Sequence, residues 1–151
     1  MIATLTRAAA MLSIALTTTL VAAQSGAPQQ LPSIHISTGM HAIQVMVAQT
    51  AEQRATGLMF RKAMGTNEGM LFVFDEPHQQ CFWMKNTLLP LSVAFIGDDG
   101  SVVNIDDMKP QTEDSHCSTK PVRFVLEMNV GWFDKRGVKP GSRFQGDPFA
   151  K

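Results

Sequence analysis

Short segments in which apolar and polar residues alternate constrain the fold of this 151-residue chain most strongly. The alternation is clear at residues 34–37, 43–48 and 122–129, and a continuous apolar run occupies residues 69–74. A period of two is typical of β-strands, and a short continuous apolar run is typical of a buried strand. Helical patterns do not alternate regularly with these strands, so we expect no doubly wound parallel sheet. The sequence predicts a mainly β protein, an antiparallel β sandwich or small barrel with one or two short helices.

Turn and capping signals place the connections between these strands. Thr50 and Gln53 have the spacing of a capping box, which predicts a short helix that ends near Arg61. The Asp-Gly pair within residues 97–100 predicts a hairpin turn between two strands. Residues 131–136 allow one further helical turn.

The N-terminus has the features of a secretory signal peptide. An apolar stretch at residues 8–20 is followed by the small residues Val21-Ala22-Ala23, which suit a signal peptidase. The stretch is shorter than the roughly 20 residues that a membrane-spanning helix needs, although a retained anchor is the alternative. We therefore expect a periplasmic or secreted protein without a membrane span after processing. The predicted organisation is a signal peptide at residues 1–23, a flexible leader at residues 24–32 and a single β domain at residues 33–151.

The charge of the chain argues against a polyanionic partner. It has 13 Lys and Arg residues and 13 Asp and Glu residues, so its formal net charge is 0. A near-neutral chain without a basic run gives no support for nucleic-acid binding.

The two cysteines, Cys81 and Cys117, predict one disulfide, because an even pair in an exported protein is usually bonded. The closed loop of about 36 residues corresponds to roughly 3–4 kcal/mol in the chain-entropy model. A redox-active or metal-binding thiol pair is the alternative, but the chain has no Cys-x-x-Cys spacing.

The segment from Cys81 to Leu88 places a Trp, a Lys and an Asn within an otherwise apolar run that ends before Pro90. As a strand, it would direct Asn86 toward the core and both Trp83 and Lys85 toward the opposite face. A buried Asn needs hydrogen-bond partners, and a covered Lys needs an acid. The segment therefore predicts either a pocket wall or a buried polar network.

Several segments together resemble the family known as domain of unknown function 192. They follow the family's order and span about residues 34–144. The matching segments are Gly57-Leu58-Met59-Phe60-Arg61, Gly69-Met70-Leu71-Phe72-Val73-Phe74, Phe82-Trp83-Met84-Lys85-Asn86-Thr87-Leu88-Leu89-Pro90-Leu91, Leu126-Glu127-Met128, Gly131-Trp132, Gly137-Val138 and Gly141. The resemblance implies a compact, mainly β domain, often exported, with no established activity. The family usually has Asp directly after the Pro-Leu pair, where this chain has Ser92, so any role of that carboxylate would be lost here.

The residue types suggest one candidate ligand site. Glu127 is the natural acid to pair with Lys85 or Arg61 across neighbouring strands. If Arg61, Trp83, Lys85, Asn86 and Glu127 converge, they form a polar cleft with an aromatic floor. Such a cleft suits a polyol or sugar, whose apolar ring face stacks on Trp while its hydroxyl groups bind polar side chains.

The favoured function is therefore a non-catalytic binding module of the cell envelope, with cell-wall carbohydrate or an envelope protein as the partner class. An envelope hydrolase is the first alternative, in which Glu127 would act with a second carboxylate from Asp106, Asp107 or Asp134. A Met- and His-based metal-binding protein is the second, because such side chains can hold copper. No cofactor and no specific metal site are predicted.

Overall fold

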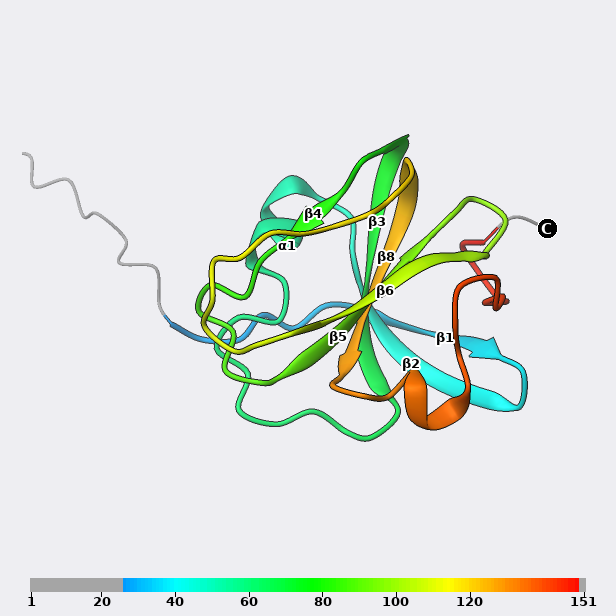
Figure 1. Cartoon of the computed structure of the whole chain (residues 1–151). Helices are drawn as coiled ribbons and strands as arrows, with labels where there is room; N and C mark the ends of the chain where they lie inside the picture. The colour runs from blue at the N-terminus through cyan, green and yellow to red at the C-terminus, as the bar shows by residue number, and fades with distance from the viewer. Residues whose placement is uncertain (1–25, 150–151) are drawn as a thin grey trace, which may run out of the picture.

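The computed structural model of the protein describes residues 26–149, and Figure 1 shows the arrangement of its elements. A six-stranded sheet with the order β1-β2-β3-β8-β5-β6 lies at the centre, and a two-stranded sheet, β4-β7, lies beside it. The predicted signal peptide, residues 1–23, lies outside the described residues. The elements in chain order are β1 (Ser33–Thr38), β2 (His41–Ala48), α1 (Ala51–Thr56), β3 (Glu68–His78), β4 (Cys81–Phe82), β5 (Leu91–Ile96), β6 (Val102–Met108), β7 (His116–Cys117), β8 (Val122–Asn129) and the 3-10 turn η1 (Asp134–Arg136).

The predicted mainly β fold is confirmed, with one parallel strand pair. Strands β2 and β3 run parallel because the chain crosses between them through α1, whereas the other neighbouring strands in the large sheet are antiparallel. The capping box at Thr50 is present, with hydrogen bonds in both directions between Thr50 and Gln53. The helix ends at Thr56 and does not extend to Arg61, because Gly57 turns the chain with a φ of +48°.

Both faces of the central sheet are covered. Figure 1 shows β3 and β8 crossed by the β1-β2 and β5-β6 pairs, so the sheet is strongly twisted. One face packs against the C-terminal segment, which contributes Trp132, Phe133, Phe144 and Phe149. The other face packs against Leu58, Met84 and partly buried Phe82. This double coverage means that both sets of alternating side chains are buried in β5 and in the middle of β8.

The C-terminal segment joins the two edge strands of the large sheet at one end. Gln145 forms a backbone bridge with Ser37 of β1, and Arg143 forms one with Ser101 beside β6. The backbone N–H of Val102 also donates to the carbonyl oxygen of Ser142, at 2.8 Å. At this end, neither edge is left without a partner.

The strand predicted for residues 81–88 is wrong beyond its first two residues. Strand β4 comprises only Cys81–Phe82, after which a turn brings the N–H of Thr87 within 3.0 Å of the Met84 carbonyl oxygen. Asn86 takes a left-handed conformation with a φ of +54° in this turn, which Asn tolerates better than most residues. Its side chain is therefore exposed and not in the core.

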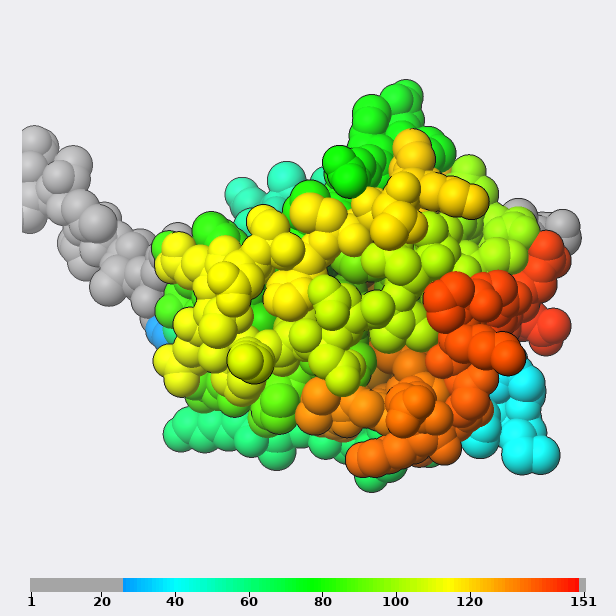
Figure 2. Space-filling model, in the orientation of Figure 1, coloured from blue at the N-terminus to red at the C-terminus, as the bar shows by residue number. Residues whose placement is uncertain are grey.

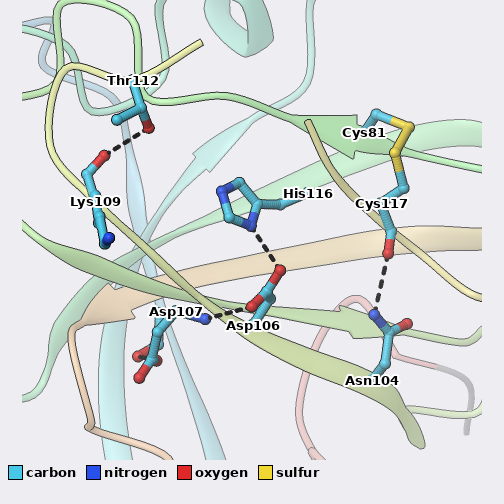
Figure 3. Close-up of polar contacts among 9 residues, drawn as sticks. Cys81, Asn104, Asp106, Asp107, Lys109, Thr112, His116 and Cys117 are labelled. Carbon is cyan, nitrogen blue, oxygen red and sulfur yellow. Dashed lines mark hydrogen bonds and ion pairs between the residues drawn. A yellow bond between two sulfur atoms is a disulfide. The ribbon is translucent and has the colours of Figure 1, made fainter. Parts of the chain in front are cut away.

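The predicted disulfide is confirmed, and it anchors the small sheet. Cys81 and Cys117 face each other in the β4-β7 pair and are bonded. Side chains of β6 hold the other side of β7, as Figure 3 shows: Asn104 donates to the Cys117 carbonyl oxygen at 3.1 Å, and Oδ2 of Asp106 lies 2.6 Å from Nδ1 of His116. The loop that carries β7, yellow in Figure 2, forms the outer surface beside β6.

Residues 26–32 contain neither helix nor strand. The side chain of Gln29 donates to the carbonyl oxygens of Gln53 and Gly57, so this part of the predicted leader contacts the domain. Its assignment as a leader stays a prediction. Within residues 26–149, no helix is long and apolar enough to cross a membrane.

Candidate functional site

Glu127 is a buried acid in the middle of the central sheet. It lies on β8 between Met70 of β3 and Val93 of β5, and only 4% of its surface is exposed. Burial raises the pKa of its carboxyl group from 4.5 to about 8, and no hydrogen bond within residues 26–149 offsets that cost. With its pKa raised above 7, the side chain is mainly the neutral carboxylic acid at pH 7, which has one O–H donor and free acceptor positions.

The Glu127 side chain lines a small cavity of about 30 Å³, which we call the Glu127 pocket. This volume holds one or two groups the size of a water molecule. Trp83 lines the same pocket and is 48% exposed, so its side chain also reaches the molecular surface. The remaining lining residues come from α1 and its C-terminal loop, from β3, from β4 and from the turn after it: Arg54, Ala55, Thr56, Gly57, Leu58, Met59, Phe72, Phe82 and Thr87.

The loop after α1 separates this pocket from a second cavity. Gly57, Leu58 and Met59 line the Glu127 pocket, whereas Arg61 lines a cavity of about 140 Å³ near β2 and the start of β3. Between them, Phe60 has a φ of +65°, a strained conformation for a bulky residue. Its backbone N–H donates to the carbonyl oxygen of Asn86 at 2.9 Å, which helps to fix the loop against the turn after β4.

The predicted ion pairs of Glu127 are wrong. Lys85 lies 3.6 Å from the exposed Glu113 and 5.2 Å from the centre of the Trp83 ring. Arg61 donates from Nη2 to the Gln29 carbonyl oxygen and to Sδ of Met46, both at 2.8 Å. Neither cation reaches the acid, because the loop after α1 and the turn after β4 direct both side chains away from it.

Of the five predicted site residues, the structure brings Trp83 and Glu127 together in one pocket, with Lys85 stacked on the Trp83 ring. Asn86 contributes its backbone carbonyl group to the Phe60 contact, and Arg61 belongs to the other cavity.

The other acids considered for catalysis line a different surface hollow of about 440 Å³, which contains Asp106, Asp107 and Asp134 but not Glu127. Within this hollow, the buried Ser92 donates from Oγ to Oδ1 of Asp107 at 2.5 Å and accepts from the Gly131 N–H at 2.8 Å. Asp107 therefore supplies a carboxylate beside the position where the family usually has Asp. Among residues 26–149, Glu127 is the only one whose carboxyl group lines the Glu127 pocket.

No group of three or more His, Cys, Asp or Glu side chains within residues 26–149 is arranged to hold a metal ion. Cys117 is bonded to Cys81 and is not a free thiol beside His116. The His116 ring instead lies against Asp106, as Figure 3 shows.

Sequence reasoning missed several of the pocket residues. Phe72, Phe82 and Thr87 are not among the predicted site residues, yet each lines the Glu127 pocket. A signal was available, because all three residues, together with Gly57, Leu58, Met59, Trp83 and Glu127, lie within the segments that carry the family resemblance. Those separate segments converge on one pocket.

The model of the family described as "Uncharacterized ACR", domain of unknown function 192, matches residues 34–146. The chain belongs to this family. A crystal structure from Sinorhizobium meliloti, described as a "putative transcription regulator", is 40% identical, with a TM-score of 0.71 over 74% of this chain and 90% of that one. A protein of unknown function from Novosphingobium aromaticivorans is 34% identical, with a TM-score of 0.74 over 85% of this chain and 99% of that one. No curated protein matches the chain.

Proposed function

We propose that this family member is an exported cell-envelope domain that binds a neutral, hydroxyl-bearing ligand, with glycan as the favoured class, and does so without catalysis. The observation that supports the proposal most directly is the buried Glu127, whose carboxyl group has no hydrogen bond within residues 26–149 and lines a pocket together with half-exposed Trp83. The signal-peptide features of the N-terminus support the envelope location.

The chemistry of the pocket favours a hydroxyl group as its occupant. A protonated carboxyl group can donate one hydrogen bond to a hydroxyl group and accept another from it, without charging either partner. The volume of about 30 Å³ admits a single hydroxyl or hydroxymethyl group and excludes a whole sugar ring. The sugar ring would stack on the exposed surface of Trp83, and Lys85, whose ammonium group lies over the Trp83 ring, would move aside to contact the hydroxyl groups.

A hydrolase is the second candidate, because a carboxyl group with a pKa of about 8 can act as a general acid. Hydrolysis of a glycosidic bond normally needs a second carboxylate, and no second one from the described part of the chain lines this pocket. Binding alone is therefore the better-supported function. A formal net charge of 0 gives no support for DNA binding by this chain.

The test is a titration of the mature, oxidised protein with N-acetylglucosamine oligomers, glucose and sorbitol, followed by tryptophan fluorescence. Trp83 is half-exposed and Trp132 is buried, so quenching by a stacked ligand reports mainly on Trp83. We expect Trp83→Ala to weaken binding about two- to tenfold, since an aromatic contact contributes roughly 0.5–1.5 kcal/mol. Because Trp83→Ala removes the fluorescent reporter, calorimetry measures binding to the variants.

Glu127→Gln is also expected to weaken binding, while Leu88→Ala should not, because Leu88 is 40% exposed and does not line the pocket. The absence of binding by every probe, or an unchanged Kd in Trp83→Ala, would contradict the proposal. Release of products from the oligomers that Glu127→Gln abolishes would instead establish the hydrolase.

A further inference from the structure

The second cavity, which Arg61 lines, is separate from the Glu127 pocket. We propose that the cavity beside Arg61 binds a small zwitterion of the α-amino acid class, with Arg61 facing its carboxylate and Glu68 facing its ammonium group.

The two charged residues of this cavity are not paired with each other. Arg61 and Glu68 both line it, yet no salt bridge within residues 26–149 joins either of them to an opposite charge. Glu68 accepts one hydrogen bond, from the Gly65 N–H at 2.8 Å. Two opposite charges around one cavity suit a ligand that carries both, because either simple ion would leave one charge unmatched.

The hydrogen bonds of Arg61 also leave donors for a ligand. Its Nη2 donates to Gln29 and Met46, but its buried Nε–H has no acceptor within residues 26–149. A buried N–H without an acceptor is costly, and a carboxylate is the acceptor that a guanidinium group binds best. A modest shift of the Arg61 side chain toward the cavity would satisfy this group with a ligand oxygen.

The size and lining of the cavity agree with this class of ligand. Its volume of about 140 Å³ exceeds that of the Glu127 pocket several-fold and accommodates several non-hydrogen atoms. Its lining also includes polar Gln30, Ser33 and Gln44, which offer amide and hydroxyl groups. Leu31 and Met46 supply the apolar contacts that a short side chain would need.

The experiment uses the methyl resonances of the methionines in the mature, oxidised protein. Glycine, L-alanine and D-alanine are titrated separately, with acetate and methylammonium as half-ligands. Met46 lines the cavity and contacts Arg61, so its methyl resonance should shift in a saturable way. Met40, 91% exposed at the β1-β2 turn, is the internal control.

We expect at least one amino acid to bind about tenfold more tightly than acetate and methylammonium, because each of these provides one of the two charge contacts. Glu68→Gln and Arg61→Gln should each weaken binding about tenfold, whereas the matched surface variant Arg143→Gln should not. Glu68 is exposed, so its variant keeps the test valid even if Arg61→Gln does not fold.

Two results would overturn the proposal. The first is the absence of a saturable Met46 shift with all three amino acids. The second is binding of acetate as tight as that of the amino acids and unchanged by Glu68→Gln, which would indicate a simple anion site. Trp83→Ala should leave amino-acid binding intact, so failure here and failure of the glycan proposal are distinguishable.

Discussion

The buried carboxyl group of Glu127 should make the protein less stable as the pH rises through the neutral range. Folding raises its pKa from 4.5 to about 8, so between these values the folded state holds a proton that the unfolded state has released. The free energy of unfolding therefore falls by about 1.4 kcal/mol per pH unit within this window, and this contribution levels off above pH 8. The contribution of this carboxyl group to stability is fully present only below pH 4.5, where both states hold the proton.

Replacing Glu127 with Gln removes this titration while keeping the side chain's shape. We expect the unfolding free energy of the variant, relative to wild type, to increase by about 3 kcal/mol between pH 5 and pH 7. Because this quantity is a change with pH, it is independent of how well Gln packs in the pocket. Urea denaturation at pH 5, 6, 7 and 8, on the oxidised protein, measures it.

The matched control is Glu52→Gln, which changes the same side chain on the exposed surface of α1. Its pH profile should follow that of wild type. A difference between Glu127→Gln and wild type that stays constant from pH 5 to pH 8 would refute the reasoning. It would mean that the carboxyl group is solvated or paired in solution, and that the Glu127 pocket is not a neutral site.

Two further predictions concern the disulfide and the hydrogen bonds of Ser92. Reduction of the Cys81–Cys117 disulfide, or replacement of both cysteines by serine, should lower the free energy of unfolding by about 4 kcal/mol, because a loop with a separation of 36 residues is released. Urea denaturation with and without reductant measures this loss. An unchanged midpoint would contradict the prediction. Ser92→Ala should lower the free energy of unfolding by about 1–3 kcal/mol, since the Gly131 N–H and the Asp107 carboxylate lose their shared partner. Ser92→Thr keeps the hydroxyl group and should recover part of this loss. Equal stabilities of the Ala and Thr variants would show that the hydroxyl group does not contribute.

Local sequence patterns predict correctly those features that depend only on neighbouring residues. The alternation at β8, the Thr50 capping box and the Gly97–Gly100 turn each specify backbone geometry within a few residues, and all three are present. The disulfide followed from the compartment that the N-terminus predicts and from the number of cysteines.

The predictions that were wrong concern features that depend on contacts between segments distant in sequence. Alternation correctly separates Glu127 from its neighbours Leu126 and Met128, but it cannot show that the second face is covered too. That cover comes from Leu58 and Met84, which are remote in sequence. The run after Cys81 likewise has the composition of a strand but forms a turn, and its Trp83 and Thr87 line the pocket.

The C-terminal segment has a consequence for how the chain should be expressed. Residues 141–145 occupy one end of both edge strands, so a truncation before residue 141 would expose unpaired backbone groups of β1 and β6 simultaneously. Exposed strand edges are templates for pairing with other chains. A shortened protein would therefore be prone to strand exchange and aggregation, even though every residue of the Glu127 pocket would still be present.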